Sequence, residues 1–246
     1  MPYNINFDRL AIATGIATDR LKAGLSTYDA MARLFPMLEV DGHEVALYGG
    51  TALNKVYFGK RQRLSYDLDI YCYSYESTLK SLRGYGAVEV PSHTFSKGQK
   101  NSRFIFQNTR LDLWKAGGRR AERPAKRVAH DLLEYFNVLV PPVAVPTYSM
   151  EYLLANKTLT MAARAEVKDI YDTWIGLQLP RDDSKYQRYI RANAGAMGIK
   201  DYGFFIDSMM HTVRKNPGYY KDKRIDALHQ PPVLAMVKDI AAALDL

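Results

Sequence analysis

The spacing of apolar side chains divides the chain into a mixed first half and a helical second half. Leu21 and Leu25 belong to a three- and four-residue repeat that predicts helix over the first forty residues. The period changes at residue 45. There the apolar run Val45–Tyr48 ends at two glycines, a pattern typical of a buried strand that stops in a tight turn. Thr51 is then expected to cap a short helix over residues 52–58.

Further elements follow along both halves. Alternating side chains predict a strand over residues 67–74, and a helix is expected over residues 75–83. Short runs predict strands over residues 88–90, 103–106 and 110–114. Ser149 is a suitable N-cap for a helical region, with later helices over residues 186–192, 204–213 and 233–246. These elements predict an α+β protein, with a mixed-sheet core over residues 1–130 and a mainly helical domain over residues 131–246.

Composition and charge limit the possible partners and the cellular compartment of the protein. The 246 residues include 34 Lys and Arg against 26 Asp and Glu, and the net charge of +8 favours a polyanionic partner or substrate. A single cysteine, Cys72, excludes an internal disulfide framework and a multi-cysteine zinc site, so a reducing, cytoplasmic setting is expected. Asp8 and Arg9 stand where a signal peptide would be apolar, and no apolar run is long enough to span a bilayer. We therefore expect a soluble protein without a membrane partner.

Two carboxylates and a Gly-Gly turn form the strongest chemical signal. Residues two apart on a strand face the same side, so Asp67 and Asp69 would present their carboxylates together. Such like charges repel, and oxygen ligands without nearby His or Cys favour Mg²⁺ or Mn²⁺ as the counter-charge. Gly49 and Gly50 would let the backbone approach a phosphate at a helix start, and the Ser65 hydroxyl would add a hydrogen bond. Each feature alone is usually a plain turn or a solvated strand end, but their order favours metal-assisted phosphoryl or nucleotidyl transfer.

A third carboxylate, Asp112, lies in another predicted strand. Its neighbours Leu111 and Leu113 are apolar and should point into the core, which leaves Asp112 on the opposite face. Beside the first pair, it would complete a metal triad and act as general base on an incoming hydroxyl. The alternative is an exposed residue on an alternating strand.

A predicted helix in the second half carries charges that suit a triphosphate. Lys157 and Arg164 are seven residues apart, nearly two turns, so they share a helix face and would grip phosphates. Asp169 and Asp172, three residues apart, would orient the lysine or contact a ribose. The alternative is an amphipathic helix with solvated charges, and it applies more to Arg164 and Lys168 than to Lys157.

Basic residues flank the predicted acidic strands in two clusters. Lys60, Arg61 and Arg63 precede the Asp pair. The second cluster follows the Asp112 strand and comprises Arg119, Arg120, Arg123, Lys126 and Arg127. Either cluster would bind an acceptor if the strands are neighbours, while solvated surface loops are the alternative. The 18 tyrosines are better explained by packing than by base stacking, and none is given a role.

These motifs resemble those of the AbiEii/AbiGii-type nucleotidyltransferase toxins, members of the DNA polymerase β-like nucleotidyltransferase superfamily. The resemblance rests on Gly49-Gly50-Thr51-Ala52-Leu53, on Arg63 through Asp69, and on a second block from Ala155 to Asp172. Family members usually carry Arg where this chain has Lys168, a change that keeps the charge and loses bidentate geometry. The resemblance implies an NTP-using toxin of a toxin–antitoxin or phage-defence pair, in which some relatives modify tRNA acceptor ends.

The residues and the resemblance together predict a metal-dependent nucleotidyltransferase that transfers NMP from an NTP to an RNA hydroxyl, a tRNA 3′ end foremost. Asp67, Asp69 and Asp112 would hold the metal, and with Lys157 they form the predicted catalytic set. The predicted nucleotide-binding residues are Gly49, Gly50, Thr51, Ser65, Lys157, Arg164, Asp169 and Asp172. The predicted acceptor-binding residues are Lys60, Arg61, Arg119, Arg120 and Arg123. The helical domain would close the NTP cleft.

Two alternatives remain open at the level of the sequence. The acceptor would be a small-molecule or protein hydroxyl in the first. In the second, the chain is a catalytically silent nucleotide-binding antitoxin rather than a toxin with a cognate antitoxin as its partner. The intact set of three aspartates and Lys157 argues against silence, because a binding module does not need all of them.

Overall fold

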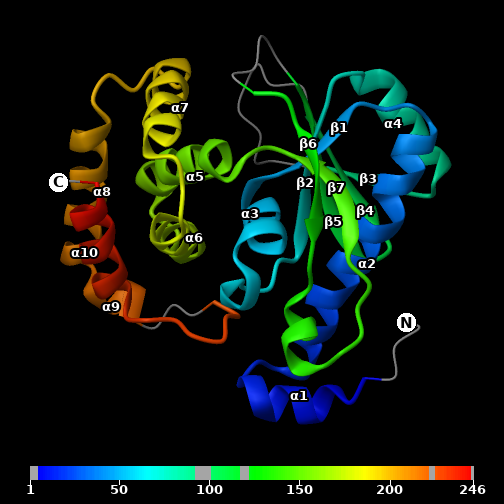
Figure 1. The fold of residues 1–246 in the computed structure, drawn as a ribbon, viewed down its shortest axis with the longest axis horizontal. Coiled ribbons are helices and arrows are strands. Elements are labelled where there is room, and N and C mark those ends of the chain that lie inside the picture. Colours follow the sequence, from blue (N-terminus) through cyan, green and yellow to red (C-terminus); the bar gives the residue numbers. More distant parts are fainter. Residues whose placement is uncertain (1–4, 92–100, 117–121, 222–224, 245–246) are drawn as a thin grey trace.

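The computed structural model describes residues 5–91, 101–116, 122–221 and 225–244, in which a mixed sheet lies between two groups of helices (Figure 1). The strands are β1 (Val45–Tyr48), β2 (Asp67–Cys72), β3 (Val88–Val90), β4 (Asn101–Phe106), β5 (Thr109–Lys115), β6 (Ala125–Ala129) and β7 (Val143–Thr147). The helices are α1 (Phe7–Thr14), α2 (Thr18–Val40), α3 (Gly49–Tyr57), α4 (Tyr75–Gly84), α5 (Met150–Arg164), α6 (Val167–Gln178), α7 (Asp183–Ala196), α8 (Tyr202–Lys215), α9 (Pro217–Lys221) and α10 (Val233–Ala243), with 3-10 turns η1 (Gly59–Arg61) and η2 (Leu132–Phe136). The α+β class and the helical second half are confirmed.

Non-local strand pairing forms the centre of the sheet. The strand order is β3-β4-β5-β2-β1-β7-β6, with β2 parallel to β5 and antiparallel to β1. In this register Asp69 lies opposite Asp112 on one side and opposite Tyr48 on the other. Residues directly opposite each other in a sheet share a face. The three aspartates of β2 and β5 therefore lie on one face, as the alternation predicts.

The two faces of the sheet differ in chemistry. Along β2 the side chains of Leu68 and Ile70 are fully buried, while Asp67 and Asp69 are half-buried. The aliphatic face packs against α2, whereas the acidic face turns towards α3 and the C-terminal helices (Figure 1). Burial of one face and partial exposure of the other explain the period of two in the sequence. This arrangement places the acidic residues between the sheet and the helical half.

The start of α3 differs from the prediction. The helix begins at Gly49, immediately after β1, with Tyr48 as its N-cap, so the expected cap at Thr51 is wrong. Gly49 has a φ of +69°, a conformation that lets β1 turn directly into the helix without a connecting loop. The Thr51 hydroxyl instead donates to the Asp67 carbonyl oxygen at 2.8 Å and ties α3 to the start of β2.

Residues 125–147 contribute two strands that the sequence pattern did not predict. β6 and β7 form an antiparallel hairpin, and β7 lies beside β1 in the sheet. Prolines cannot donate to a ladder, and Pro141, Pro142 and Pro146 made this segment resemble a loop. The hairpin extends the sheet to Thr147, so the predicted boundary at residue 130 falls between two paired strands. The helical half begins at Ser149, whose hydroxyl caps α5 by accepting from the Tyr152 amide as expected.

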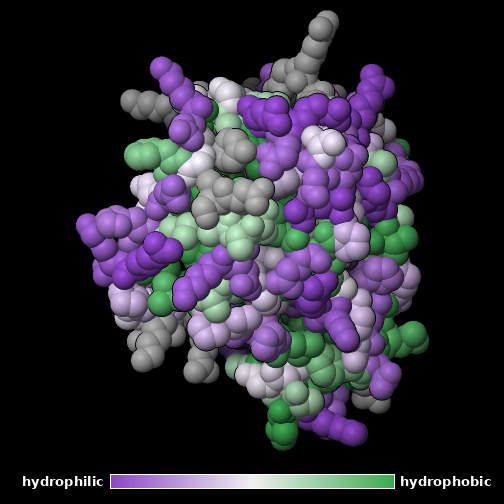
Figure 2. Space-filling view, turned by 60° about the vertical axis from the view of Figure 1, so that its left-hand side comes forward, coloured by the Kyte–Doolittle hydropathy of each residue, from purple (hydrophilic) through white to green (hydrophobic). Residues whose placement is uncertain are grey.

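No helix among the described residues combines the length and the apolar character that crossing a membrane would require. The face formed by the C-terminal half intersperses hydrophilic with hydrophobic residues (Figure 2).

A buried ion pair fixes the C-terminal end of α3. Lys55 Nζ lies 2.6 Å from Asp131 Oδ2, both side chains are fully buried, and the ammonium lies 5.6 Å from the centre of the Tyr28 ring. Asp131 also caps η2 by accepting from the Leu133 amide. Removing one partner of a buried pair leaves an uncompensated charge, which costs more than removing both.

We expect Lys55→Met to lower the free energy of unfolding by about 3–5 kcal/mol, because it leaves the buried Asp131 carboxylate without its ion-pair partner. The double variant Lys55→Met with Asp131→Asn should lose less, since Asn keeps the acceptor for Leu133 and carries no charge. Urea unfolding measures both. A double variant no more stable than the single one would contradict this account of the pair.

Candidate active site

An acidic face and a basic cluster meet at the N-terminal end of α3. On the acidic side, Asp69 lies directly against Gly49, and a Cβ added at Gly49 would come within 2.5 Å of Asp69 Oδ2. Only glycine therefore allows this approach, which its positive φ also favours. The strand end that carries Asp67 and Asp69 is in this way fixed against the turn that begins the helix.

Two arginines that the sequence reasoning missed neutralise part of the acidic face. Arg103 on β4 donates to both oxygens of Asp112, with Nε–Oδ1 at 2.6 Å and Nη2–Oδ2 at 2.9 Å. Arg110 on β5 forms an ion pair with Asp67 and approaches Asp112 Oδ2 to 3.8 Å with its Nε. The alternation of Arg110 and Asp112 was visible in the sequence, but the position of Arg103 depends on the β4–β5 register.

Of the three carboxylates on this face, Asp69 is the one whose negative charge is least compensated by neighbouring positive charge. Its removal from water, together with repulsion from Asp67 and then from Asp112, raises the pKa of Asp69 to about 6. The Trp114 indole lies 3.4 Å from Asp69 Oδ1 and opposes the rise only in part. A cation beside Asp69 would remove this penalty.

Two of the three carboxylates on this face are suited to bind a divalent cation in their present arrangement. Among the described residues, no three His, Cys, Asp or Glu side chains are arranged to hold a metal ion. Asp67 and Asp69 supply the oxygen ligands that Mg²⁺ or Mn²⁺ prefers, and the raised pKa of Asp69 reflects a site that lacks positive charge. Asp112, 5% exposed, has both oxygens bound by Arg103 and can join a metal only by leaving that arginine. The residues fit the ion with Asp67 and Asp69 as the primary pair.

On the basic side, Gly50 lies within a buried cluster of charges. A Cβ at Gly50 would come within 2.6 Å of Arg63 Nη2, 2.8 Å of Asp172 Oδ2 and 3.1 Å of Lys157 Nζ. Arg63 binds the Asp172 carboxylate with Nε at 2.9 Å and Nη2 at 2.7 Å, and Asn54 donates to Asp172 Oδ1 at 2.9 Å. The absence of a side chain at Gly50 thus brings the backbone at the start of α3 against these charges.

Lys157 is held between two carboxylates of α6. Its Nζ donates to Asp169 Oδ1 at 2.8 Å and lies 3.2 Å from Asp172 Oδ2. Burial alone would lower the pKa of Lys157, but Asp172 and Asp169 raise it, so the residue stays an ammonium. Burial likewise opposes ionisation of Asp169, yet Lys157 and Arg164 together lower the pKa of Asp169 to about 2.

The charge left over differs between the two sides of the site. Arg63, Lys157 and Arg164 face the two carboxylates of Asp169 and Asp172, which leaves one positive charge in excess. Lys168 and the exposed Glu166 pair with each other at 3.2 Å and cancel. The acidic face has three carboxylates and two arginines, so one negative charge is in excess there. An anion is therefore favoured at Gly50 and a cation at Asp69.

The remaining predicted nucleotide-binding residues have distinct surroundings. Thr51 already donates its hydroxyl to the Asp67 carbonyl, so its role in the structure is to hold α3 on β2. Ser65 is 1% exposed, and its hydroxyl finds no partner among the described residues. A buried hydroxyl without a partner is costly, and a phosphate oxygen that reached Ser65 Oγ would remove this cost.

Those predicted acceptor residues that the structure describes, Lys60, Arg61 and Arg123, are not gathered around the acidic face. Lys60 and Arg61 lie in η1, past the C-terminal end of α3 and about 13 Å along that helix from Gly49. Arg123 lines a groove of about 540 Å³ together with α2 residues, and Lys126 pairs with Glu39 of α2. Arg119 and Arg120 lie outside the described residues. The neighbouring Arg63, grouped with this cluster in the sequence, is buried against Asp172 instead.

The family follows from a match to a family model. The chain matches the model described as Nucleotidyl transferase AbiEii toxin, Type IV TA system, over residues 33–201. The chain belongs to the AbiEii nucleotidyltransferase toxin family. This AbiEii protein is therefore a nucleotidyltransferase, and the family implies an NTP co-substrate and typically a divalent metal. A search of curated proteins finds no match.

Solved structures agree with the fold of the AbiEii chain. MenT4, a nucleotidyltransferase toxin from Mycobacterium tuberculosis H37Rv, aligns with a TM-score of 0.60 and 16% identity, covering 99% of this chain and 91% of that one. The antibiotic-resistance factor ANT(2'')-Ia aligns with a TM-score of 0.47 and 13% identity, covering 74% of this chain and 95% of that one. A protein from H. pylori described as a nucleotidyltransferase aligns with a TM-score of 0.46 and 14% identity, covering 93% of each chain. The first likeness supports the fold, and the other two carry no further conclusion.

The raised pKa of Asp69 predicts a pH-dependent penalty in the metal-free protein. A carboxyl whose pKa is higher in the folded than in the unfolded state stabilises the fold while protonated, and this contribution is lost as pH rises through about 6. With a chelator present, Asp69→Asn should match wild type below about pH 4 and have the higher melting temperature at pH 7–8. Asp207→Asn on α8, exposed and with the same change in charge, is the control. A difference that does not change with pH would contradict the prediction.

Proposed function

We propose that this protein transfers NMP from an NTP to an RNA hydroxyl with the help of a divalent metal and releases pyrophosphate. The observation that carries the proposal is the meeting, at the N-terminal end of α3, of an acidic face short of positive charge and a basic cluster with positive charge to spare. A metal nucleotide has this same division, with a cation bound to a polyanion. Family membership supports the transfer chemistry, and the acceptor is the part that the proposal adds.

The chain's own residues would bind and orient the triphosphate. The first N–H groups of α3 belong to Gly49, Gly50 and Thr51, and a helix N-terminus of this kind favours an anion. The two glycines lack side chains, so Asp69 on one side and Lys157 on the other come close to this backbone. Lys157 lies beside Gly50 and keeps its charge through Asp169 and Asp172, so it can donate to a phosphate oxygen without being neutralised. Arg164 and Ser65 supply a second cation and a hydroxyl donor. Arg63 and Asn54 hold Asp172 in place and act by positioning.

The metal, when bound to Asp67 and Asp69, supplies charge that polarises the phosphoryl oxygens. Asp112 is suited to receive the proton of the attacking hydroxyl, because it lies beside Asp69 in the sheet register. Arg103 must release at least one Asp112 oxygen before that can happen. The same release would leave a guanidinium next to the acceptor, where it can pair with an RNA phosphate.

RNA, and a tRNA 3′ end foremost, is the acceptor that the charge favours. The net charge of +8 attracts polyanions from solution, and a single-stranded 3′ end offers a free hydroxyl with phosphates close to it. The Type IV toxin–antitoxin family supports a cognate antitoxin as the partner that limits growth inhibition.

Incubation with each labelled NTP, Mg²⁺ and total RNA tests the transfer directly. We expect labelled RNA with wild type and a loss of more than tenfold with Asp69→Asn or Asp67→Asn, because the metal ligands are removed without opening a cavity.

Lys157→Ala should lower kcat/KM on the order of a hundredfold, since it removes a charged contact to phosphate. Lys168→Ala removes a half-buried lysine of α6 that pairs with Glu166, and as the matched control it should retain activity. Label in a small molecule or protein, with RNA unlabelled, would replace RNA as the acceptor.

Salt should weaken transfer to RNA far more than binding of the NTP. Contacts to a single strand release counterions, with a log–log slope of about −0.7 for each phosphate neutralised. We expect transfer to fall at least tenfold between roughly 50 and 200 mM salt. Joint replacement of Arg119, Arg120 and Arg123 by Ala should flatten this dependence and leave NTP affinity unchanged. A salt-independent rate with RNA would contradict the electrostatic account.

A further inference from the structure

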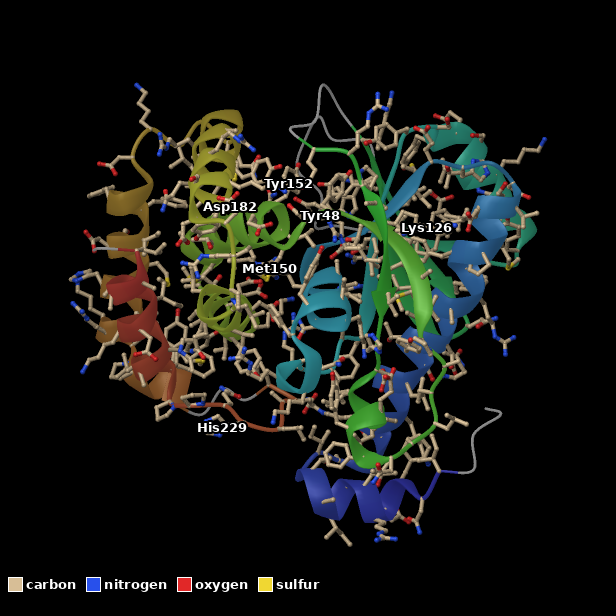
Figure 3. The ribbon with its side chains drawn as sticks, viewed as in Figure 1. Tyr48, Lys126, Met150, Tyr152, Asp182 and His229 are labelled. Carbon is tan, nitrogen blue, oxygen red and sulfur yellow. The ribbon has the colours of Figure 1, made fainter. Side chains whose placement is uncertain are left out.

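A row of aromatic rings leads away from the acidic face across the sheet to α5. It comprises Trp114 on β5, Tyr71 on β2, Tyr48 at the end of β1 and Tyr152 on α5, here called the aromatic row. Ring centres are 6.4 Å apart from Trp114 to Tyr71, 4.3 Å from Tyr71 to Tyr48 and 6.4 Å from Tyr48 to Tyr152. Figure 3 shows Tyr48 and Tyr152 between the sheet and α5. The row thus spans from the sheet to the helical half.

The row starts at the carboxylate that we place nearest the metal. The Trp114 indole nitrogen lies 3.4 Å from Asp69 Oδ1, and Tyr48 lies opposite Asp69 in the β1–β2 register. Tyr71 is two residues beyond Asp69 on the same strand, so its ring is on the same face. A molecule with a charged end at Asp69 and Gly50 would therefore meet these rings with its next part.

The rings of the row are half-buried, unlike those that support them. Trp114, Tyr71, Tyr48 and Tyr152 all keep part of their surface exposed. Behind them Tyr148 is fully buried, 4.8 Å from Tyr152 and 5.8 Å from Tyr48. The opposite face of the same strands is aliphatic and closed. Tyr48 and Tyr152 also pack against the hydrophobic core, Tyr152 with its ring centre 5.2 Å from that of Tyr189. The four rings of the row nevertheless keep exposed surface in line with the site.

We propose that the aromatic row is a stacking surface for a nucleobase, supplied either by the nucleotide bound at Asp69 and Gly50 or by the acceptor strand. A base has a flat π-face that stacks on tyrosine and tryptophan, and it is joined through its sugar to the phosphates for which the neighbouring charges are suited. The edge-to-face angle of 84° between Tyr48 and Tyr71 gives the row surfaces of two orientations. The inference rests on the proposed function for the nature of the ligand, but it concerns binding and not transfer.

A ligand without a base tests the proposal in the protein as it stands. Trp114 and Trp174 are the two tryptophans of the chain, and Trp174 lies on α6 with its indole bonded to Asp239. In a Trp174→Phe background, fluorescence therefore reports Trp114 alone. With Mg²⁺ present, we expect ATP, CTP, GTP or UTP to quench Trp114 and at least one of them to bind tenfold or more tightly than inorganic tripolyphosphate, as measured by calorimetry.

Variants of the row separate stacking from phosphate binding. Tyr71→Ala and Tyr152→Ala should bring nucleotide affinity down to that of tripolyphosphate and leave tripolyphosphate affinity unchanged. Tyr71→Phe keeps the π-face and should restore nucleotide binding. Tyr219→Ala removes an exposed tyrosine of α9 that is no part of the row and serves as the control. Thermal unfolding checks that each variant is folded.

Single-stranded RNA without NTP forms a second arm that identifies the source of the base. Tyr71-dependent binding of free NTP assigns the row to the incoming nucleotide, and Tyr71-dependent binding of RNA alone assigns it to the acceptor; either supports the proposal. Equal affinity for NTP and tripolyphosphate, with RNA binding unaffected by Tyr71→Ala, would overturn it. If Tyr71→Ala does not fold, the wild-type comparison of NTP with tripolyphosphate decides. Row-dependent binding without any transfer would leave the row standing and reject the proposed function instead.

Discussion

The buried carboxylate of Asp172 is the constraint on which the rest of the site depends. It must be fully paired because a lone buried charge costs about 3–5 kcal/mol, and its partners come from three separate segments: Arg63, Asn54 and Lys157. These partners can converge only where no side chain intervenes, at Gly50. The need to satisfy Asp172 therefore holds α3, α5, α6 and the segment before β2 together. The basic cluster beside α3 follows from that requirement.

On the acidic face the repulsion between like charges is only partly compensated. Three carboxylates on adjacent strands repel, and no backbone rearrangement can separate them without breaking the β2–β5 register. Arg103 and Arg110 supply positive charge from within the sheet, at Asp112 and Asp67, and leave Asp69 as the group under most strain. A cation bound at Asp67 and Asp69, as we propose, would compete with Arg110 for the Asp67 carboxylate. The two sides of the site also differ in burial, since Arg63, Lys157, Asp169 and Asp172 are buried, whereas Asp67 and Asp69 are half-buried.

The parts of this structure that the sequence could predict are those that rest on local periodicity. The period of two places Asp67, Asp69 and Asp112 on one face, and the Gly-Gly pair marks the turn into α3. Burial of Arg63 and the position of Arg103 depend on pairing between distant segments, which no local pattern reveals. β7 was missed because its prolines contradict strand propensity, whereas its place beside β1 is set by tertiary packing. The aromatic row could not be seen in the sequence, because the sheet register aligns Trp114, Tyr71 and Tyr48, and the packing of α5 adds Tyr152.

The hairpin of β6 and β7 has a consequence for the way the chain is made on the ribosome. β1 has its second neighbour only when residues 143–147 have emerged, so the nascent chain exposes an open strand edge for almost a hundred residues of synthesis. At about 5–20 residues per second this interval lasts about 5 to 20 seconds. Asp172, 118 positions after Asn54, arrives later still. An AbiEii chain interrupted before that point carries the aspartates that we propose as metal ligands without the basic cluster that we propose for the nucleotide, so on this proposal truncated translation products would lack activity.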